Sequence, residues 1–447
     1  MNSALEALTA RLTQAVRPSA PSATESLGSV RVSLGGSLVR RIAGFAGPGY
    51  LVAVGYMDPG NWATALGAGS AHGNALLCVV VAASLIAMAL QAAAARLGVA
   101  GEIDLAQACR RHYPRSVSLL LWVACEIAIV ACNLAEVLGM AVGLKLLFDI
   151  PLPLGVGLTA LDVALALALQ RRGIRALEAF IIALITLIGT SFAIEIAWLA
   201  PSPAALIAAL LPRRELVTHP DMLYLAIGIL GATVMPHNLY LHSALVQTRR
   251  HERSAHGVRA ALRWATLDST LALSLALLVN VGILVLAAGV FHRPGQAPVT
   301  ELADAYRLLS PLLGVKAASG LFGIALIASG LSASITGTLA GQIVMEGFLE
   351  LRISPVRRAL LTRALALGPA AIVAASAGDS GITRLLVLSQ VVLGVQLPFA
   401  LVPLLAFTTR RAVLGEFAFG RLAAALLWLL AALVLALTLW GLHALWR

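Results

Sequence analysis

The sequence predicts an all-α integral membrane protein of eleven transmembrane helices. They are expected to form an inverted repeat of five plus five helices with one helix appended, and the first and sixth helices are expected to be broken. Three observations predict this fold: an apolar composition, regularly spaced apolar runs, and two proline-containing breaks. Of the 447 residues, 60% are hydrophobic and 12% are charged, whereas soluble domains carry about 25% charged residues. The chain is therefore expected to lie in a lipid bilayer.

Apolar runs of about 20 residues, the length that crosses a bilayer, define the eleven spans. They fall at 42–70, 75–99, 116–147, 152–170, 175–200, 221–247, 265–291, 317–346, 358–376, 382–407 and 420–445. We expect the first repeat over 42–200, the second over 221–407, and the eleventh helix within 420–447. Residues 1–41 hold Ser, Pro, Ala and Arg without a long apolar run, which predicts a disordered cytoplasmic tail.

Basic residues are concentrated in every second loop, as in the clusters at 110–115, 171–175 and 249–263. The positive-inside rule then places the N-terminus in the cytoplasm and, with an odd number of spans, the C-terminus outside. The same spacing accounts for the net charge of +11. A nucleic-acid partner is not expected, because it would require the arginines to gather on one face or in one domain.

Two short polar motifs interrupt the apolar runs. Asp58-Pro59-Gly60-Asn61 lies in the first span and Met235-Pro236-His237-Asn238 lies in the sixth. Proline removes a backbone donor and clashes with the preceding turn, so each span should split into two half-helices with freed carbonyls. An offset of five spans reverses the direction in which the chain crosses the membrane. This is typical of inverted repeats with a binding site near the midplane.

The side chains at these breaks predict a cation site. Asp58 offers a carboxylate, which is costly inside a membrane unless it is paired, and Asn61 offers an amide oxygen. Met235 offers a polarizable sulfur, which favours Mn²⁺, Fe²⁺, Co²⁺ or Cd²⁺ over Mg²⁺ and Ca²⁺. Two other interpretations stay open: Asp58 could pair with an internal arginine, and Met235 could be a packing residue.

The segments Asp58–Thr64 and Gly231–Ser243 resemble the natural resistance-associated macrophage protein (Nramp) family of proton-coupled divalent-metal transporters, in particular its bacterial manganese transporters. The resemblance extends from about residue 42 to the end of the chain. It implies the LeuT-like fold of the bacterial sodium-coupled amino-acid transporters. It also implies that the backbone carbonyls of Gly55 and Ala232 ligate the metal. Gln390 matches a position that approaches the metal when the outward gate closes; an interhelical hydrogen bond is the alternative for this residue.

A proton route is expected beside the metal site. Asp58 is the expected first proton acceptor, because burial favours its neutral form and metal binding forces it to ionise. The resemblance implies a polar network leading inward, and the candidates for it are Glu126, Glu136, His237, Arg357 and Arg358. His237 is expected to serve gating or proton transfer rather than ligation. At Asn133 the sequence departs from the family, which commonly has aspartate there, and an amide cannot carry a proton.

We therefore predict a secondary transporter that imports Mn²⁺, and also Fe²⁺, Co²⁺ and Cd²⁺, by alternating access with proton symport. Metal ion and proton are substrates, and no cofactor is expected. The protein should be a monomer in the bacterial inner membrane. Two alternatives remain: a sodium-coupled organic-solute symporter of the same fold, which has no use for Asp58 and Met235, and an uncoupled metal uniporter. An enzyme is not expected, because no H-E-x-x-H or G-x-S-x-G motif is present.

Overall fold

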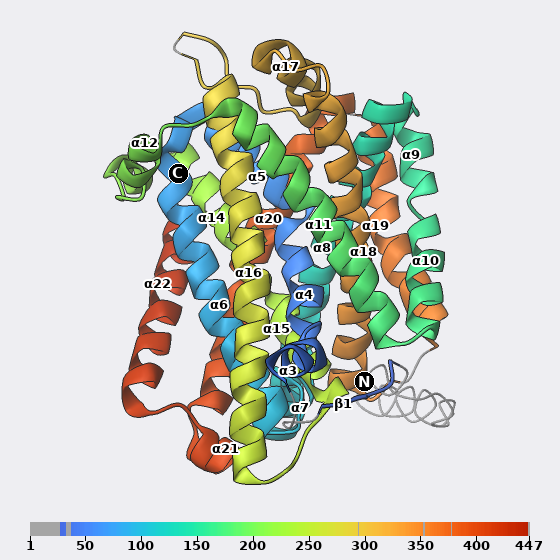
Figure 1. The fold of residues 1–447 in the computed structure, drawn as a ribbon, viewed down its shortest axis with the longest axis vertical. Helices are drawn as coiled ribbons and strands as arrows, with labels where there is room; N and C mark the ends of the chain where they lie inside the picture. Colours follow the sequence, from blue (N-terminus) through green and yellow to red (C-terminus); the bar gives the residue numbers. More distant parts are fainter. Residues whose placement is uncertain (1–26, 33–36, 294, 352–353, 377, 446–447) are drawn as a thin grey trace, which may run out of the picture.

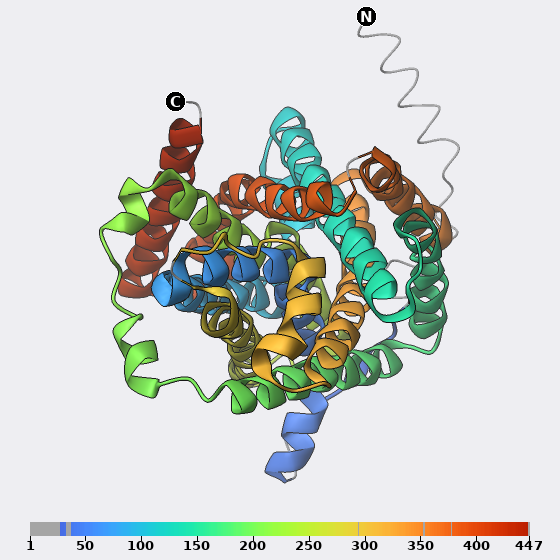
Figure 2. The same ribbon diagram turned by 90° about the horizontal axis from the view of Figure 1, so that it is seen from above.

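The computed structural model describes residues 27–32, 37–293, 295–351, 354–376 and 378–445. Its long helices stand side by side as an upright bundle (Figure 1). Seen from above, the α4–α5 segment lies inside a ring of other helices (Figure 2). The chain elements α3 and α7 lie at one end of the bundle with α21, and α12 and α17 lie at the other end (Figure 1).

The elements correspond closely to the predicted spans. The first half contains β1 (Val30–Arg31), α3 (Leu38–Phe45), α4 (Pro48–Ala53), η1 (Val54–Met57), α5 (Pro59–His72), η2 (Gly73–Leu76), α6 (Leu77–Ala100), α7 (Leu105–His112), α8 (Arg115–Phe148), α9 (Leu152–Leu158), α10 (Leu161–Arg171) and α11 (Ile174–Leu199). The second half contains α12 (Pro203–Ala208), α13 (Glu215–Thr218), α14 (Pro220–Val234), α15 (Pro236–Leu245), η3 (Val246–Thr248), β2 (Arg249–Arg250), α16 (Ala255–Phe291), α17 (Leu302–Leu313), α18 (Ala318–Leu349), α19 (Pro355–Ser376), α20 (Gly378–Thr408), α21 (Arg411–Leu414), η4 (Gly415–Phe417) and α22 (Arg421–Leu445).

Within the described residues, nine helical segments are long and apolar enough to cross a membrane. The expected number of eleven stays a prediction. The difference lies in two places: α5 and α6 form one continuous helical segment over Pro59–Ala100, and α19, the predicted span 358–376, is not among the nine. Since α19 carries buried arginines, its lower apolarity has a physical basis in the polar network described below.

The first break lies between α4 and α5, as the proline predicts. The N-terminus of α4 is capped by the Asp268 carboxylate, which accepts hydrogen bonds from the backbone N–H groups of Gly47 (3.2 Å) and Gly49 (2.7 Å). After the single turn η1, Asp58 adopts an extended conformation (φ −65°, ψ 164°) and α5 begins at Pro59. Asp58 is thus the N-cap of α5, the position where a short acidic side chain satisfies free backbone donors.

The second break lies between α14 and α15. α14 ends at Val234, and α15 begins at Pro236, so Met235 alone separates the two half-helices. Met235 has φ 40° and ψ 98°, a conformation that costs a residue with a side chain about 1 to 3 kcal/mol. Packing around this buried side chain must hold the backbone there, which is typical of functional sites.

Part of the segment expected to be a disordered tail is ordered. β1 pairs in parallel with β2, with Val30 opposite Arg249. Leu27 is buried and its carbonyl accepts a hydrogen bond from the Ile174 N–H at 2.9 Å. The prediction of disorder over 1–41 is therefore wrong for residues 27–32, because a backbone partner 219 residues away is invisible in local composition. Residues 1–26 and 33–36 lie outside the described residues.

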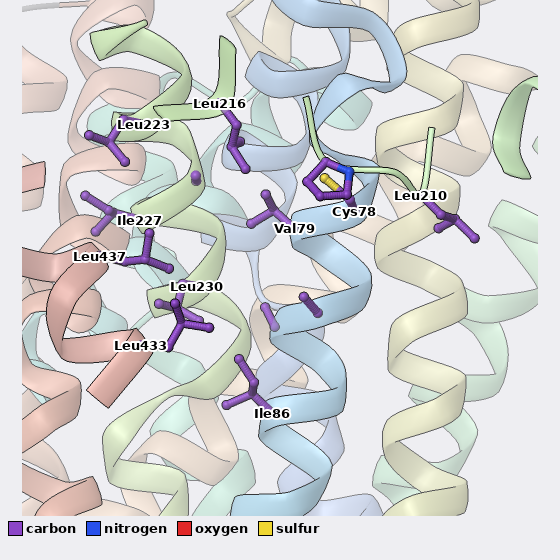
Figure 3. Close-up of a pocket in the computed structure, with 14 residues that line it drawn as sticks. Cys78, Val79, Ile86, Leu210, Leu216, Leu223, Ile227, Leu230, Leu433 and Leu437 are labelled. Carbon is purple, nitrogen blue, oxygen red and sulfur yellow. The ribbon is translucent and has the colours of Figure 1, made fainter. Parts of the chain in front are cut away.

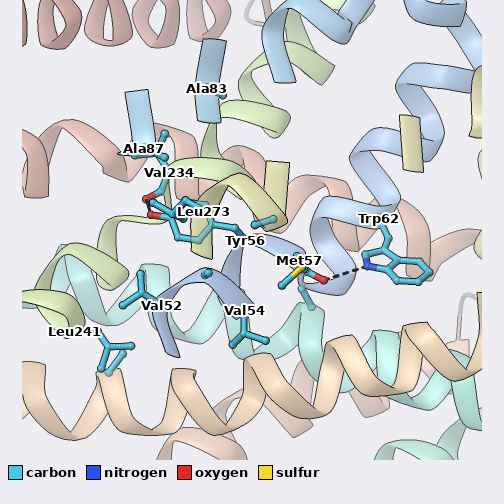
Figure 4. Packing of buried hydrophobic residues seen from close by; sticks show 14 of the residues in the cluster. Val52, Val54, Tyr56, Met57, Trp62, Ala83, Ala87, Val234, Leu241 and Leu273 are labelled. Atoms are coloured by element: carbon cyan, nitrogen blue, oxygen red, sulfur yellow. Dashed lines mark hydrogen bonds between the residues drawn. The ribbon is translucent and has the colours of Figure 1, made fainter. Parts of the chain in front are cut away.

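Aromatic packing fixes the first break inside the bundle. Trp62 contacts Phe192 and Phe322 edge to face, at centroid distances of 4.9 and 5.1 Å. Its indole N–H donates to the Met57 carbonyl at 3.1 Å (Figure 4), and the Ser329 hydroxyl donates to the same oxygen. α11 and α18 thereby hold both sides of the break, and the walls of the site are rigid.

Candidate functional site

The carboxylate of Asp58 lies at the centre of the site. Asp58 is fully buried. Its Oδ1 accepts two hydrogen bonds from Asn61, one from the backbone N–H at 2.8 Å and one from the side-chain Nδ2 at 2.7 Å. Among the described residues, its Oδ2 has no hydrogen-bond partner. A buried carboxylate oxygen without a partner is costly, so this oxygen is free to take a cation or a proton.

Asn61 joins the two broken helices. Its Nδ2 also donates to the backbone carbonyl of Ala232 at 3.0 Å, across the interface from α5 to α14. The amide nitrogen therefore bridges the Asp58 carboxylate and the Ala232 carbonyl. These are two of the oxygens that were predicted to ligate a metal. The other predicted backbone ligand, the Gly55 carbonyl, accepts from the Asp58 N–H at 3.3 Å.

Met235 faces the first broken helix. A Cβ atom on Gly55 would lie 3.2 Å from the Met235 sulfur and 2.5 Å from the Asn238 amide nitrogen, so only glycine allows this close approach. The Asn238 Nδ2 lies 3.4 Å from the same sulfur and 3.5 Å from the Val52 carbonyl. Met235 also belongs to a small buried cluster with Ala128 and Cys132 of α8 and Leu393 of α20. Its side chain is therefore buried among the first broken helix, α8 and α20.

Gln390 of α20 closes a further side of the site. Its side chain lies against Gly60, where an added Cβ would overlap its amide group. Its backbone lies against Gly231 of α14. The Gln390 Nε2 donates to the Ser389 hydroxyl at 3.0 Å, and among the described residues its Oε1 has no hydrogen-bond partner. The structure thus brings Gln390 between the two broken helices, with an amide oxygen available.

A network of buried charges lies beside the site. The Arg363 guanidinium of α19 forms an ion pair with Asp162 of α10 and lies 3.8 Å from the Glu136 carboxylate of α8. The Ser334 hydroxyl of α18 donates to Asp162 at 2.6 Å and accepts from Arg363 at 2.8 Å. Four helices therefore share one polar cluster, and Glu136, which was predicted for the proton route, is part of it. Glu136 also accepts from the Cys132 thiol at 3.4 Å.

A second pair lies further along α8. The Glu126 carboxylate accepts from the Arg358 guanidinium at 2.6 Å and from the Trp122 indole at 3.0 Å. Arg358 is 4% exposed, whereas the adjacent Arg357 is exposed. Of the two predicted arginines, only Arg358 is brought to a carboxylate of α8.

His237 and Asn133 lie apart from these pairs. His237 is buried, and its Nδ1 has no hydrogen-bond partner within the described chain. The Asn133 Nδ2 donates to the Ile129 carbonyl of its own helix at 2.8 Å. This amide is thus satisfied locally.

Two residues of this network, Arg363 and Asp162, are not among the site residues predicted from the sequence. Both are charges inside predicted spans, 358–376 and 152–170, and ionisable residues at membrane depth are themselves a functional signal. That signal is present in the sequence, but it cannot identify the partner, because the two residues are 201 apart in the chain and meet only through packing.

The donor set restricts what the site can bind. Across the described residues, no three His, Cys, Asp or Glu side chains lie together as a metal cluster. A cation at Asp58 would therefore complete its coordination with amide and carbonyl oxygens and the thioether. That mixture of hard oxygens with one soft sulfur suits divalent transition ions better than Mg²⁺ or Ca²⁺.

One titratable group outside the membrane-spanning segments ties the end of α15 to a loop. Asp104 is the N-cap of α7 and accepts from the Gln107 N–H at 2.8 Å, while the adjacent Leu105 N–H donates to the Ser243 hydroxyl of α15 at 3.0 Å. Burial, with a smaller contribution from the nearby Glu346 carboxylate, raises the pKa of Asp104 to about 7, although the backbone N–H groups that donate to the carboxylate lower it.

Two broken helices that meet around a buried carboxylate, inside a bundle of membrane-spanning helices, define a multi-pass membrane transporter. The Nramp family model, described as natural resistance-associated macrophage protein-like, matches residues 49–444. The divalent metal cation transporter MntH of Xanthomonas campestris is 53% identical over 428 residues, which cover 96% of each chain. MntH of Bradyrhizobium diazoefficiens is 54% identical over 422 residues, 94% of each chain. The chain belongs to the Nramp family.

Solved structures agree with this assignment. The manganese transporter of Eremococcus coleocola is similar at a TM-score of 0.86 and 36% identity, covering 95% of this chain and 90% of that one. Mhp1, a nucleobase-cation-symport-1 family transporter, matches at a TM-score of 0.58 and 14% identity, covering 96% and 93% of the two chains. At that identity Mhp1 shows the fold alone, and it confirms the predicted LeuT-like architecture.

Proposed function

We propose that this protein imports divalent transition-metal ions, Mn²⁺ first and also Fe²⁺, Co²⁺ and Cd²⁺, by alternating access with proton symport. The observation that carries the proposal is the Asp58 carboxylate, which is buried at a helix break with one unpartnered oxygen and is linked through Asn61 to the Ala232 carbonyl. Relatives named divalent metal cation transporters at 53 and 54% identity support the same substrate class.

Asn61 is the residue whose side chain is proposed to reorient when a metal binds. Its amide nitrogen now bridges the two oxygens of Asp58 and Ala232 that a cation would bridge. Rotation of this amide by half a turn replaces the donor by its carbonyl oxygen. An arriving ion then meets the Asp58 carboxylate, the Ala232 and Gly55 carbonyls, and the Asn61 oxygen in place of an N–H group.

Met235 and Gln390 complete the proposed coordination. The Met235 sulfur faces Gly55 without an intervening side chain, and it supplies the soft ligand. Gln390 supplies its free Oε1 when α20 closes against Gly60. Both ligands come from elements that can move relative to α5, so they suit a site that is assembled on closure.

The proposed proton path starts at Asp58. When the metal displaces its proton, the nearest acidic group in the polar network is Glu136, which Arg363 holds beside Asp162. Glu126, which pairs with Arg358, lies 10 residues before Glu136 on α8, toward the end of the helix at Arg115. It is the next proton-transfer group of the proposed path. His237 has a free ring nitrogen and could exchange protons with water.

In the proposed orientation the N-terminus is cytoplasmic and the C-terminus is outside. β1 and the last turn of α22 lie toward opposite ends of the bundle (Figure 1), which fits an odd number of crossings. A divalent ion that enters across about −100 mV gains about 4.6 kcal/mol, twice the value for one charge. The membrane potential alone can therefore drive uptake, and proton coupling adds to it.

The test uses proteoliposomes that contain both a metal-sensitive and a pH-sensitive dye. Mn²⁺ should enter and acidify the lumen, whereas Mg²⁺ and Ca²⁺ should not enter. Asp58→Ala should abolish Mn²⁺ entry, and uptake that persisted in this variant would reject the site. Arg357→Gln is the control, because it changes the charge of an exposed residue and should leave Mn²⁺ entry unchanged.

An uncoupled uniporter is the second candidate, and the position of Asn133 favours it. This amide is bound to its own helix and cannot relay a proton. If Mn²⁺ enters without acidification, Asn133→Asp should introduce coupling. If neither the unmodified protein nor Asn133→Asp acidifies the lumen, proton transfer along α8 is excluded and the protein is a uniporter.

A further inference from the structure

A second cavity lies away from the proposed metal site, on the outer surface of the bundle (Figure 3). It has a volume of about 280 Å³ and lies between α6, α14, α22 and the loop that precedes α14. Its walls are almost entirely aliphatic, with one thiol, Cys78. Figure 3 shows Leu216 and Cys78 toward one end and Ile86 toward the other, so the cavity is elongated along α6.

The position of this cavity restricts its occupant. α6, α14 and α22 all belong to the membrane-spanning part of the protein. Two lining side chains, Leu210 of the segment before α14 and Leu433 of α22, are 44 and 50% exposed. The surrounding medium is therefore hydrocarbon, and the molecules that can reach the cavity laterally are membrane lipids.

A further hollow, which His72, Asn74 and Arg213 line together with small apolar residues, has neighbouring chain positions in common with the apolar cavity. Cys78 lines the apolar cavity, and Ala75, three residues earlier in the chain, lines the hollow. In the same way Pro212 lines the apolar cavity, and the next residue, Arg213, lines the hollow. The hollow has a volume of about 590 Å³, and its lining residue Arg213 is exposed.

We propose that the two cavities together form a binding site for one glycerophospholipid. An acyl chain fills the apolar cavity between α6, α14 and α22, and the phosphate lies at Arg213 in the hollow. The chemistry is complementary at both ends, because an aliphatic slot accepts a methylene chain and a guanidinium pairs with a phosphate in a bidentate geometry. The volume of the apolar cavity, about 280 Å³, is near the lower end of the usual range for ligand pockets, so the cavity fits one acyl chain rather than a whole lipid.

The bound chain would contact a moving part of the transporter. α14 is the first half of the broken sixth helix and carries the Ala232 carbonyl. Leu223, Ile227 and Leu230 of α14 line the cavity, and Leu223 and Ile227 also belong to a buried cluster with Val391 of α20. A lipid at this site therefore contacts α14 beside its packing against α20.

The test uses the full chain in liposomes with a phospholipid that carries a photoreactive diazirine on one acyl chain. Adducts should concentrate on the cavity residues of α6, α14 and α22. Ala82→Trp fills the cavity from an exposed lining position, and adducts should fall about tenfold, as expected when about two methylene groups lose their contacts. The matched control is Leu85→Trp on the same helix, which is 57% exposed and does not line the cavity. Equal labelling of both variants would overturn the acyl-chain site.

Two further measurements separate the headgroup from the tail and do not depend on Ala82→Trp folding. Photoreactive diacylglycerol, which lacks phosphate, should label the cavity several-fold less than the phospholipid, and Arg213→Gln should remove the difference. Equal labelling by the two lipids in the unmodified chain would overturn the phosphate contact. Cys78 is a native reporter, because Cys109, Cys125 and Cys132 are buried and it alone of the four described cysteines is partly exposed. Added phospholipid should slow its alkylation in delipidated protein, and an unchanged rate would contradict the proposal.

Discussion

Gly60 offers the sharpest test of how closely α20 approaches the metal site. In Gly60→Ala, the new Cβ would overlap the Gln390 amide and lie 2.8 Å from its Cγ, well inside ordinary contact distance. The side chain would have to rotate away and lose its 3.0 Å hydrogen bond to Ser389. Overpacking of this kind costs about 1 to 3 kcal/mol, and the lost hydrogen bond adds about 1 kcal/mol. Replacement of a helical glycine returns at most about 1 kcal/mol.

We therefore expect Gly60→Ala to lower the stability of the protein by about 1 to 3 kcal/mol. Gln390→Ala removes the overlapping atoms, so the double variant should be more stable than Gly60→Ala alone, with an interaction energy of about 1 to 2 kcal/mol. Gly67→Ala is the matched control in the same helix, because its Cβ would lie 3.5 Å from Leu225, an ordinary contact. It should be neutral or slightly stabilising.

The assay is the thermal unfolding midpoint in detergent, measured for the four variants and the unmodified chain, together with Mn²⁺ uptake in proteoliposomes. The expected order of stability places Gly60→Ala lowest and the double variant above it. If the double variant unfolded at the same temperature as Gly60→Ala, the clash with Gln390 would not be the cause, and the contact between α20 and α5 would be refuted.

Three further predictions follow from other contacts. Met235→Ala should keep part of the Mn²⁺ uptake while admitting Ca²⁺ and Mg²⁺ more readily, since the soft ligand is lost; unchanged metal selectivity would count against the sulfur. Arg363→Met should destabilise by about 3 to 5 kcal/mol, because it leaves buried carboxylates without their partner, whereas Arg357→Met at an exposed position should stay within about 0.5 kcal/mol in unfolding experiments. The pKa of Asp104 is raised to about 7 in the folded chain, so the folded state holds the proton more tightly. The contribution of this group to stability should therefore fall as pH rises from about 4 to about 7, by about 1.4 kcal/mol per pH unit at most. Asp104→Asn keeps the cap and should flatten this part of the stability profile measured between pH 4 and 8.

The positions of the two breaks could be predicted because local chemistry determines them. A proline after a polar residue inside an apolar run stops the helix wherever the run is placed, and the structure has α5 and α15 beginning at Pro59 and Pro236. Apolar length likewise located most helices to within a few residues. Neither argument needs to know which helices are neighbours.

The polar network could not be predicted, because it depends on helix rotation and packing. Arg357 and Arg358 are equivalent in sequence, yet adjacent residues on a helix point about 100° apart, and only Arg358 faces Glu126. Arg363 is a charge within a predicted span, and its partner Asp162 comes from a different helix. The local sequence indicates that a charge is buried, whereas tertiary packing determines which residues it contacts.

Two glycines explain how one site can be both preformed and conformation-dependent. Gly55 and Gly60 flank Asp58, and each allows a side chain from another element to approach the backbone: Met235 and Asn238 at the first, and Gln390 at the second. The bonds between Asp58 and Asn61 are local to the start of α5, so they survive any rigid movement of its neighbours. The contact from Asn61 to Ala232 crosses to α14 and breaks if α14 moves away. In the proposed mechanism, a weak carboxylate–amide site therefore persists in every state, and full coordination forms only when α14 and α20 close on α5. The proposed metal affinity then differs between the states, and this difference would allow an ion to be taken up on one side of the membrane and released on the other.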